Sequence, residues 1–124
     1  MKMYLIDVIN EKAEVVEAED KLEDFYRLLN CSVIDIVRRK VGGRFYDIIC
    51  DDNGLFAENP KISAIDDFGN VMFVGNLLIT GLPDEEGELT SLTDGDIAYI
   101  SKRVDNMSTR LYPAGYMMLT QCNY

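Results

Sequence analysis

The sequence contains no histidine and no tryptophan, and only three of its 124 residues are cysteines. Without histidine, the chain lacks the side chain that most often serves as a general base near neutral pH. Cys31, Cys50 and Cys122 are widely spaced and form no CxxC pair, which argues against a zinc site and a disulfide framework. We therefore expect small buried thiols, a reducing cytoplasmic location, no cofactor, no metal ion and no enzymatic activity.

The chain also lacks long apolar runs, and one long stretch of it is nearly free of basic residues. No apolar run approaches the roughly 20 residues of a membrane-spanning helix. Between Phe45 and Ser101, Lys61 is the only basic residue beside twelve acidic ones, a local net charge of −11, whereas the rest of the chain carries +1. The formal net charge of −10 therefore arises in this stretch. Such a surplus argues against DNA, RNA or a membrane as the partner and favours a protein with a basic surface.

What is present indicates an ordered protein. Hydrophobic residues make up 48% of the chain, enough to form one globular domain over residues 1–124 without disulfide support. β-prone runs predict a hairpin over residues 3–9 and 13–18, and a second over residues 32–41 and 44–51. Gly42-Gly43 joins the second hairpin, where both turn positions favour a positive φ. Turns follow at Asp52-Asn53-Gly54 and at residues 66–70. Strands are expected over the very apolar residues 71–80, as a central strand interrupted at Gly75, and over residues 111–119.

Two short helices are predicted, over residues 21–29 and 94–105. Asp20, with Glu23 three residues later, resembles a capping box, and Asn30 is a plausible left-handed stop. Thr93 and Asp96 have the same spacing at the start of the second helix. The order of elements predicts an α+β fold, a mostly antiparallel sheet built from hairpins with two short helices packed on it.

The middle of the chain is similar to a known family. The successive motifs are Asp51-Asp52-Asn53-Gly54-Leu55, Asn59, the strand Phe73-Val74-Gly75-Asn76-Leu77-Leu78-Ile79, and Gly87-Glu88-Leu89-Thr90-Ser91-Leu92-Thr93-Asp94. Over about residues 30–105 this succession resembles the domain-of-unknown-function family 3846, small proteins of phages and mobile elements. Leu55-Phe56-Ala57-Glu58 stand where family members tend to carry a basic residue and Gly-Leu-Pro. The resemblance implies a mobile-element origin and an intracellular setting, and it transfers no catalytic residue.

Two opposite charge clusters are candidate sites. The expected partner-binding acidic face comprises Asp47, Asp51, Asp52, Asp66, Asp67, Asp84, Glu85, Glu86 and Glu88. The other candidate is the basic hairpin of Arg38, Arg39, Lys40 and Arg44, where strand alternation places Arg39 on the face opposite Arg38 and Lys40. This hairpin end is expected to protrude, either as a solvated tip or as a phosphate-binding site beside the turn amides.

Three functional hypotheses follow. The first is an inhibitor of a host defence, anti-CRISPR or anti-restriction-like, that binds a basic host protein through charge complementarity. The second is a sponge that sequesters a nucleotide signal, with phosphate at the basic hairpin and a base stacked on Phe45 or Tyr46. The third is an accessory domain with no independent activity. The Tyr/Met-rich C-terminal segment, with Tyr112, Tyr116 and Tyr124, fits either homo-oligomerisation or a buried core.

Overall fold

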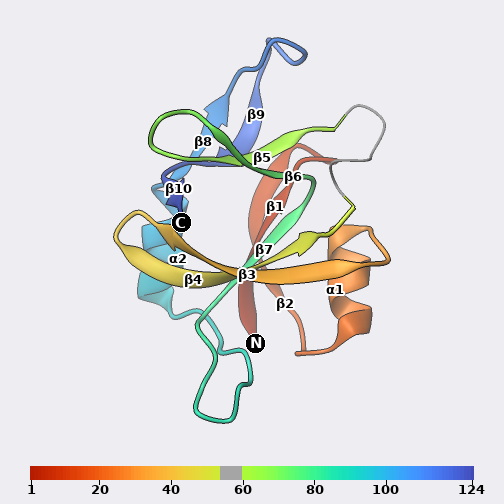
Figure 1. Ribbon diagram of the computed structural model, residues 1–124, viewed down its shortest axis with the longest axis vertical. Coiled ribbons are helices and arrows are strands. Elements are labelled where there is room, and N and C mark those ends of the chain that lie inside the picture. The colour runs from red at the N-terminus through yellow and green to blue at the C-terminus, as the bar shows by residue number, and fades with distance from the viewer. Residues whose placement is uncertain (54–59) are drawn as a thin grey trace.

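The computed structural model describes residues 1–53 and 60–124, and in them the chain forms ten strands and two helices (Figure 1). Residues 54–59 lie outside the described residues. They include Gly54, Leu55 and Asn59 of the family motifs and the Leu55–Glu58 departure from the family pattern. The elements are β1 (Lys2–Asp7), β2 (Lys12–Glu17), α1 (Leu22–Leu29), β3 (Ile34–Val41), β4 (Arg44–Asp51), β5 (Ile62–Ile65), β6 (Val71–Val74), β7 (Leu77–Thr80), α2 (Asp94–Ser101), β8 (Val104–Met107), β9 (Tyr116–Leu119) and β10 (Cys122–Asn123).

The strands form two sheets rather than one. The larger has the order β10-β3-β4-β7-β1-β2, and the smaller has the order β6-β5-β9-β8. Every pairing is antiparallel except that of β5 with β9. The predicted α+β class and the predominance of antiparallel pairing are confirmed, and both predicted hairpins are present as β1–β2 and β3–β4.

The larger sheet is covered on both faces. On one face, Phe25 and Leu29 of α1 pack against Leu5, Ile49 and Leu78 of the sheet. Residues next to these in the same strands, such as Ile48, Leu77 and Ile79, point to the other face of the sheet. There they pack against side chains of the smaller sheet and of α2. A strand buried on both faces is apolar without alternation, which explains why all four residues of β7 are buried.

The predicted strand over residues 71–80 is wrong as a single element. The chain leaves the smaller sheet after Val74 and enters the larger one at Leu77. Gly75 takes φ 85°, and the side chain of Asn76, which is only 4% exposed, fixes the crossover. Its Oδ1 accepts from the amides of Val8 and Ile9, and its Nδ2 donates to Asp7. β7 is central, as expected, whereas β6 is an edge strand.

The predictions for the helices are confirmed in part. Thr93 and Asp96 form the capping box of α2, and Asn30 ends α1 with φ 52°. The expected cap at Asp20 is wrong, because Lys21 occupies the N-cap position without a side-chain bond. The second helix is shorter than predicted. It ends at Ser101, and Val104 begins β8. Val104 is β-branched and favours a strand, and pairing of β8 with β9 buries it to the same extent as the predicted helix would.

The C-terminal strand is also shorter than expected. Tyr112 and Gly115 belong to a turn, in which the Gly115 amide donates to the Tyr112 carbonyl, and β9 starts at Tyr116. Tyr116 and Met118 are core residues, exposed by 2% and 1% respectively, whereas Tyr124 is exposed. Most of the Tyr/Met-rich segment therefore belongs to the core, and homo-oligomerisation through it stays a prediction.

Candidate functional site

The structure distributes the predicted acidic residues over several places. Asp47 is 5% exposed and accepts a bond of 3.2 Å from Arg38 Nε, opposite it on β3. Asp66 closes the β5–β6 turn by accepting from the amides of Phe68 and Asn70. In Figure 1 this turn and the end of β4 lie on opposite sides of the molecule, and the loop after β7 lies at its lower end. The nine carboxylates therefore do not form a single face.

A different grouping of carboxylates does form. The loop over residues 84–88 lies at the same end of the molecule as the connection between β2 and α1, because the Leu89 amide donates to Asp20 Oδ2 over 3.3 Å. Leu89 also packs against the core beneath α1. We call this set of exposed carboxylates the acidic end, and it consists of Glu17, Glu19, Asp20, Asp84, Glu85, Glu86 and Glu88.

The acidic loop has a defined conformation. Asp84 Oδ1 accepts from the amides of Glu86 and Glu88, over 2.9 and 3.0 Å. At the base of the loop, Thr90 Oγ1 donates to the Leu82 carbonyl, over 2.7 Å. Asp84 thus orders the loop, while the exposed Glu85, Glu86 and Glu88 carboxylates form no hydrogen bond with residues 1–53 or 60–124. A loop whose backbone is already fixed loses less conformational entropy when a partner binds.

The tip of the basic hairpin does not protrude freely. The Gly43 amide donates to the Tyr99 hydroxyl of α2 over 2.7 Å, and the Gly42 amide donates to the Gln121 carbonyl. Of the two glycines, Gly42 has a positive φ, of 60°, and Gly43 does not. The Tyr99 ring also lies under the Arg44 guanidinium, at 4.2 Å. The hairpin is therefore docked onto α2.

The basic side chains of this hairpin point to different surroundings. Arg38 pairs with Asp47, and Lys40 lies over the half-exposed Phe45 ring at 5.3 Å. Arg39 lies on the opposite face, as predicted, over the rings of Tyr124 and Phe73. The structure does not gather these cations with Arg44 into one site.

Of the two rings expected to stack on a base, Tyr46 is buried and donates its hydroxyl proton to Asp96 over 2.8 Å. Phe45 is 48% exposed. Phosphate binding at this hairpin stays a prediction.

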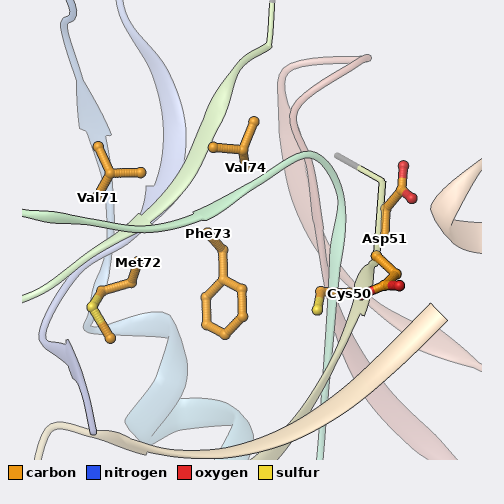
Figure 2. Close-up of a pocket in the computed structure, with 7 residues that line it drawn as sticks. Cys50, Asp51, Val71, Met72, Phe73 and Val74 are labelled. Atoms are coloured by element: carbon orange, nitrogen blue, oxygen red, sulfur yellow. The ribbon is translucent and has the colours of Figure 1, made fainter. Parts of the chain in front are cut away.

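An open cleft, which the sequence analysis does not predict, lies between the two sheets. A cavity of about 250 Å³ runs between the end of β4 and the whole of β6 (Figure 2), and it is lined by Cys50, Asp51, Asp52, Val71, Met72, Phe73 and Val74. In the close-up the Phe73 ring and the Cys50 thiol extend into the space between the strands, and Asp51 stands at its margin. The cleft is thus apolar with an acidic margin.

The thiols are poorly suited to nucleophilic chemistry. Burial and then the Asp35 and Asp52 carboxylates raise the pKa of Cys50 from 9.0 to about 11, and burial raises the pKa of Cys122 to about 12. The reactive species of a cysteine is its thiolate, which is scarce near pH 7 at such pKa values. Among the described residues, no three His, Cys, Asp or Glu side chains are grouped so that they could hold a metal ion.

These pKa values predict a loss of stability in alkali. Because the folded pKa values of Cys50 and Cys122 lie above the ordinary 9.0, the unfolded chain loses protons first as the pH rises. The contribution of these two thiols to the free energy of unfolding should be constant below about pH 8 and fall by a few kcal/mol, as an order of magnitude, between about pH 9 and 12. Urea unfolding at successive pH values measures it. A Cys50→Ala/Cys122→Ala variant should show a shallower fall, and an identical slope would contradict the assignment.

Comparison with known proteins places the chain in a family. Residues 1–105 match the family model described as "Domain of unknown function (DUF3846)", so the protein belongs to that family. The match includes the first hairpin and α1, which lie outside the resemblance predicted from residues 30–105. No curated protein and no solved structure matches the chain. No helix in the described part of the chain is long and apolar enough to span a membrane.

Proposed function

We propose that this protein binds a partner protein with a basic surface through the acidic end. The observation that carries the proposal is the ordered acidic loop, in which Asp84 fixes the backbone and leaves Glu85, Glu86 and Glu88 directed to solvent. The acidic end also holds Lys21, which pairs with Glu19 over 2.7 Å, but carboxylates remain in excess. Such an excess of one sign accelerates encounter with an oppositely charged surface and orients the partner before contact. In the finer form of the proposal, the partner is a host-defence protein and binding inhibits it on behalf of a mobile element.

The acidic end is tested by neutralising charges that have no structural role. A Glu85→Gln/Glu86→Gln/Glu88→Gln variant keeps Asp84, and therefore the loop, intact. Immobilised protein should capture a basic partner from bacterial lysate. With the purified pair, we expect the triple variant to associate roughly tenfold more slowly and dissociate at a similar rate, because exposed peripheral charges mainly steer encounter. Raising the salt from about 0.05 to about 0.3 M should slow the parent similarly.

A matched control removes the same charge elsewhere. Glu14, Asp35 and Asp105 are exposed and lie outside the acidic end, so a Glu14→Gln/Asp35→Asn/Asp105→Asn variant should associate nearly as fast as the parent. If both triple variants slow equally, net charge and not this surface is responsible. An association rate unaffected by either variant and by salt would contradict the proposal.

The finer proposal requires a cellular measurement. Expression of the protein in a bacterium that carries the captured defence should raise the plating efficiency of a phage which that defence restricts. The acidic-loop variant should lose this effect, and the control variant should keep it. Capture of a basic partner without any change in plating would retain the binding function and exclude the inhibitor.

A further inference from the structure

We propose that the cleft beside β6 takes an extended segment of a partner protein, which adds as a further strand to the smaller sheet and carries basic residues at both ends. β6 is the outermost strand of this sheet in the described residues. All four of its consecutive residues line the cavity. Alternate residues of a strand point to opposite faces, so a cavity that touches all four follows the edge of the strand rather than one face.

β6 is short and its pairing with β5 is irregular, but it lacks the charged side chains that blunt two of the other sheet edges. Exposed edge strands tend to pair with other chains, and proteins blunt them with charges or by shortening them. β2 carries exposed Lys12, Glu14 and Glu17, β8 carries Asp105, and β10 has only two residues. β6 reads Val-Met-Phe-Val, without a charge or a proline. An uncharged edge beside an open cavity is the arrangement that strand addition requires.

The surface along this edge favours an apolar segment. Val71 is 51% exposed, and Phe68 in the turn before it is 88% exposed. Phe73 extends into the cleft and lies beneath the Arg39 guanidinium, at 5.8 Å, which helps to hold the ring in place. Alternate apolar side chains of an added strand would contact these groups.

Carboxylates at both ends of β6 indicate the charge of the occupant. Asp51 and Asp52 line the cavity near the end of β4. Asp67 is exposed in the turn that leads into Val71, at the opposite end of the strand. Four strand residues span about 13 Å, so an added segment that carries basic residues on either side of a four-residue apolar stretch would face carboxylates at both ends. Charge complementarity therefore selects an extended basic–apolar–basic segment.

The proposal uses a surface separate from the acidic end, so the two can fail independently. The probe is a fluorescein-labelled Lys-Lys-Val-Thr-Val-Thr-Lys-Lys peptide, followed by fluorescence anisotropy, and the matched probe has glutamates in place of the lysines. We expect saturable binding of the lysine peptide and at least tenfold weaker binding of the glutamate peptide. Amide hydrogen exchange at Val71–Val74 should slow when the lysine peptide is bound, as pairing requires.

Variants locate the binding. Val71→Lys should lower the affinity for the lysine peptide at least tenfold, because it places a charge on the edge of β6. Thermal unfolding checks that this variant is folded. Asp52→Asn/Asp67→Asn, at exposed positions, should weaken it about tenfold without affecting the fold. The Glu85→Gln/Glu86→Gln/Glu88→Gln variant should bind it within about twofold of the parent, which separates this site from the acidic end.

Several outcomes would overturn the inference. One is the absence of saturable binding up to about 1 mM peptide. The others are an affinity that neither Val71→Lys nor Asp52→Asn/Asp67→Asn changes, and binding that does not slow hydrogen exchange of the β6 amides. A concentration-dependent dimer of the parent that Val71→Lys abolishes would assign the edge to a second copy of the chain instead.

Discussion

Replacement of Asn76 by alanine is expected to lower the free energy of unfolding by about 3 kcal/mol, with a fall in Tm of roughly 10 °C. The side chain bonds the amides of Val8 and Ile9 and the Asp7 carboxylate, and both Asn76 and Asp7 are buried. Alanine would leave the buried Val8 amide without a partner and remove one donor from the buried Asp7 carboxylate, and each loss costs about 1–3 kcal/mol. Urea unfolding at neutral pH measures the loss.

Asn10→Ala is the matched comparison, because the exposed Asn10 side chain donates to the other oxygen of the same Asp7 carboxylate, over 2.8 Å. It should cost about 1 kcal/mol, since water can replace an exposed donor. Burial opposes ionisation of Asp7, but the bonds from Asn10 and Asn76 outweigh it and hold the pKa of Asp7 below 3.8. The stability from this shift is present above the ordinary pKa and is lost as the pH falls through the folded value.

The pKa of Asp7 should therefore rise in Asn76→Ala, as NMR titration of the carboxyl carbon can detect. An Asn76→Ala variant as stable as Asn10→Ala, with an unchanged pKa at Asp7, would show that the crossover between the sheets does not depend on this network.

Ile79→Ala is expected to destabilise the protein by about 3–4 kcal/mol. Ile79 is fully buried in β7, between β1 and β4, and belongs to the core that joins the larger sheet to the smaller one. Removing three carbons from such a position loses the free energy gained by burying them. It also leaves a cavity that the packed neighbours on both sides fill only in part. Thermal or urea unfolding measures the loss.

Ile36→Ala is the control, because Ile36 lies on β3 of the same sheet but is 44% exposed. The same atoms are removed, yet the expected cost is below about 1 kcal/mol, since less area leaves water on folding and no closed cavity results. Equal losses for the two variants would contradict the placement of β7 at the centre of the sheet.

The features that could be predicted from sequence depend on local chemistry. Thr93 and Asp96 cap α2 because a hydroxyl and a carboxylate three residues apart can each reach the other's amide. Asn30 tolerates the left-handed conformation that ends α1, and Gly42 permits the tight turn of the second hairpin. In each case the interacting groups lie within a few residues of each other, so a short stretch of sequence is enough to predict the feature.

Features that depend on distant partners were missed or misplaced. Val71–Val74 and Leu77–Thr80 are equally apolar, and nothing local shows that they belong to different sheets. The sequence predicts Asp47 on an exposed face, whereas its register opposite Arg38 and Thr80 buries it. The cleft requires β4 and β6, which belong to different sheets, to lie near each other. The one available signal was Gly75-Asn76, a pair that rarely belongs inside an uninterrupted central strand.

The placement of β9 and β10 has a consequence for synthesis on the ribosome. The family match ends at residue 105, yet β9 lies between β5 and β8, and β10 pairs with β3. Leu119 and Cys122 are fully buried. While residues 1–105 emerge, the smaller sheet lacks the strand that joins its two halves, so the core between the two sheets cannot close. This core can be completed only after β9 and β10 have emerged, and its apolar strands translated earlier remain open to chaperones and to aggregation in the meantime.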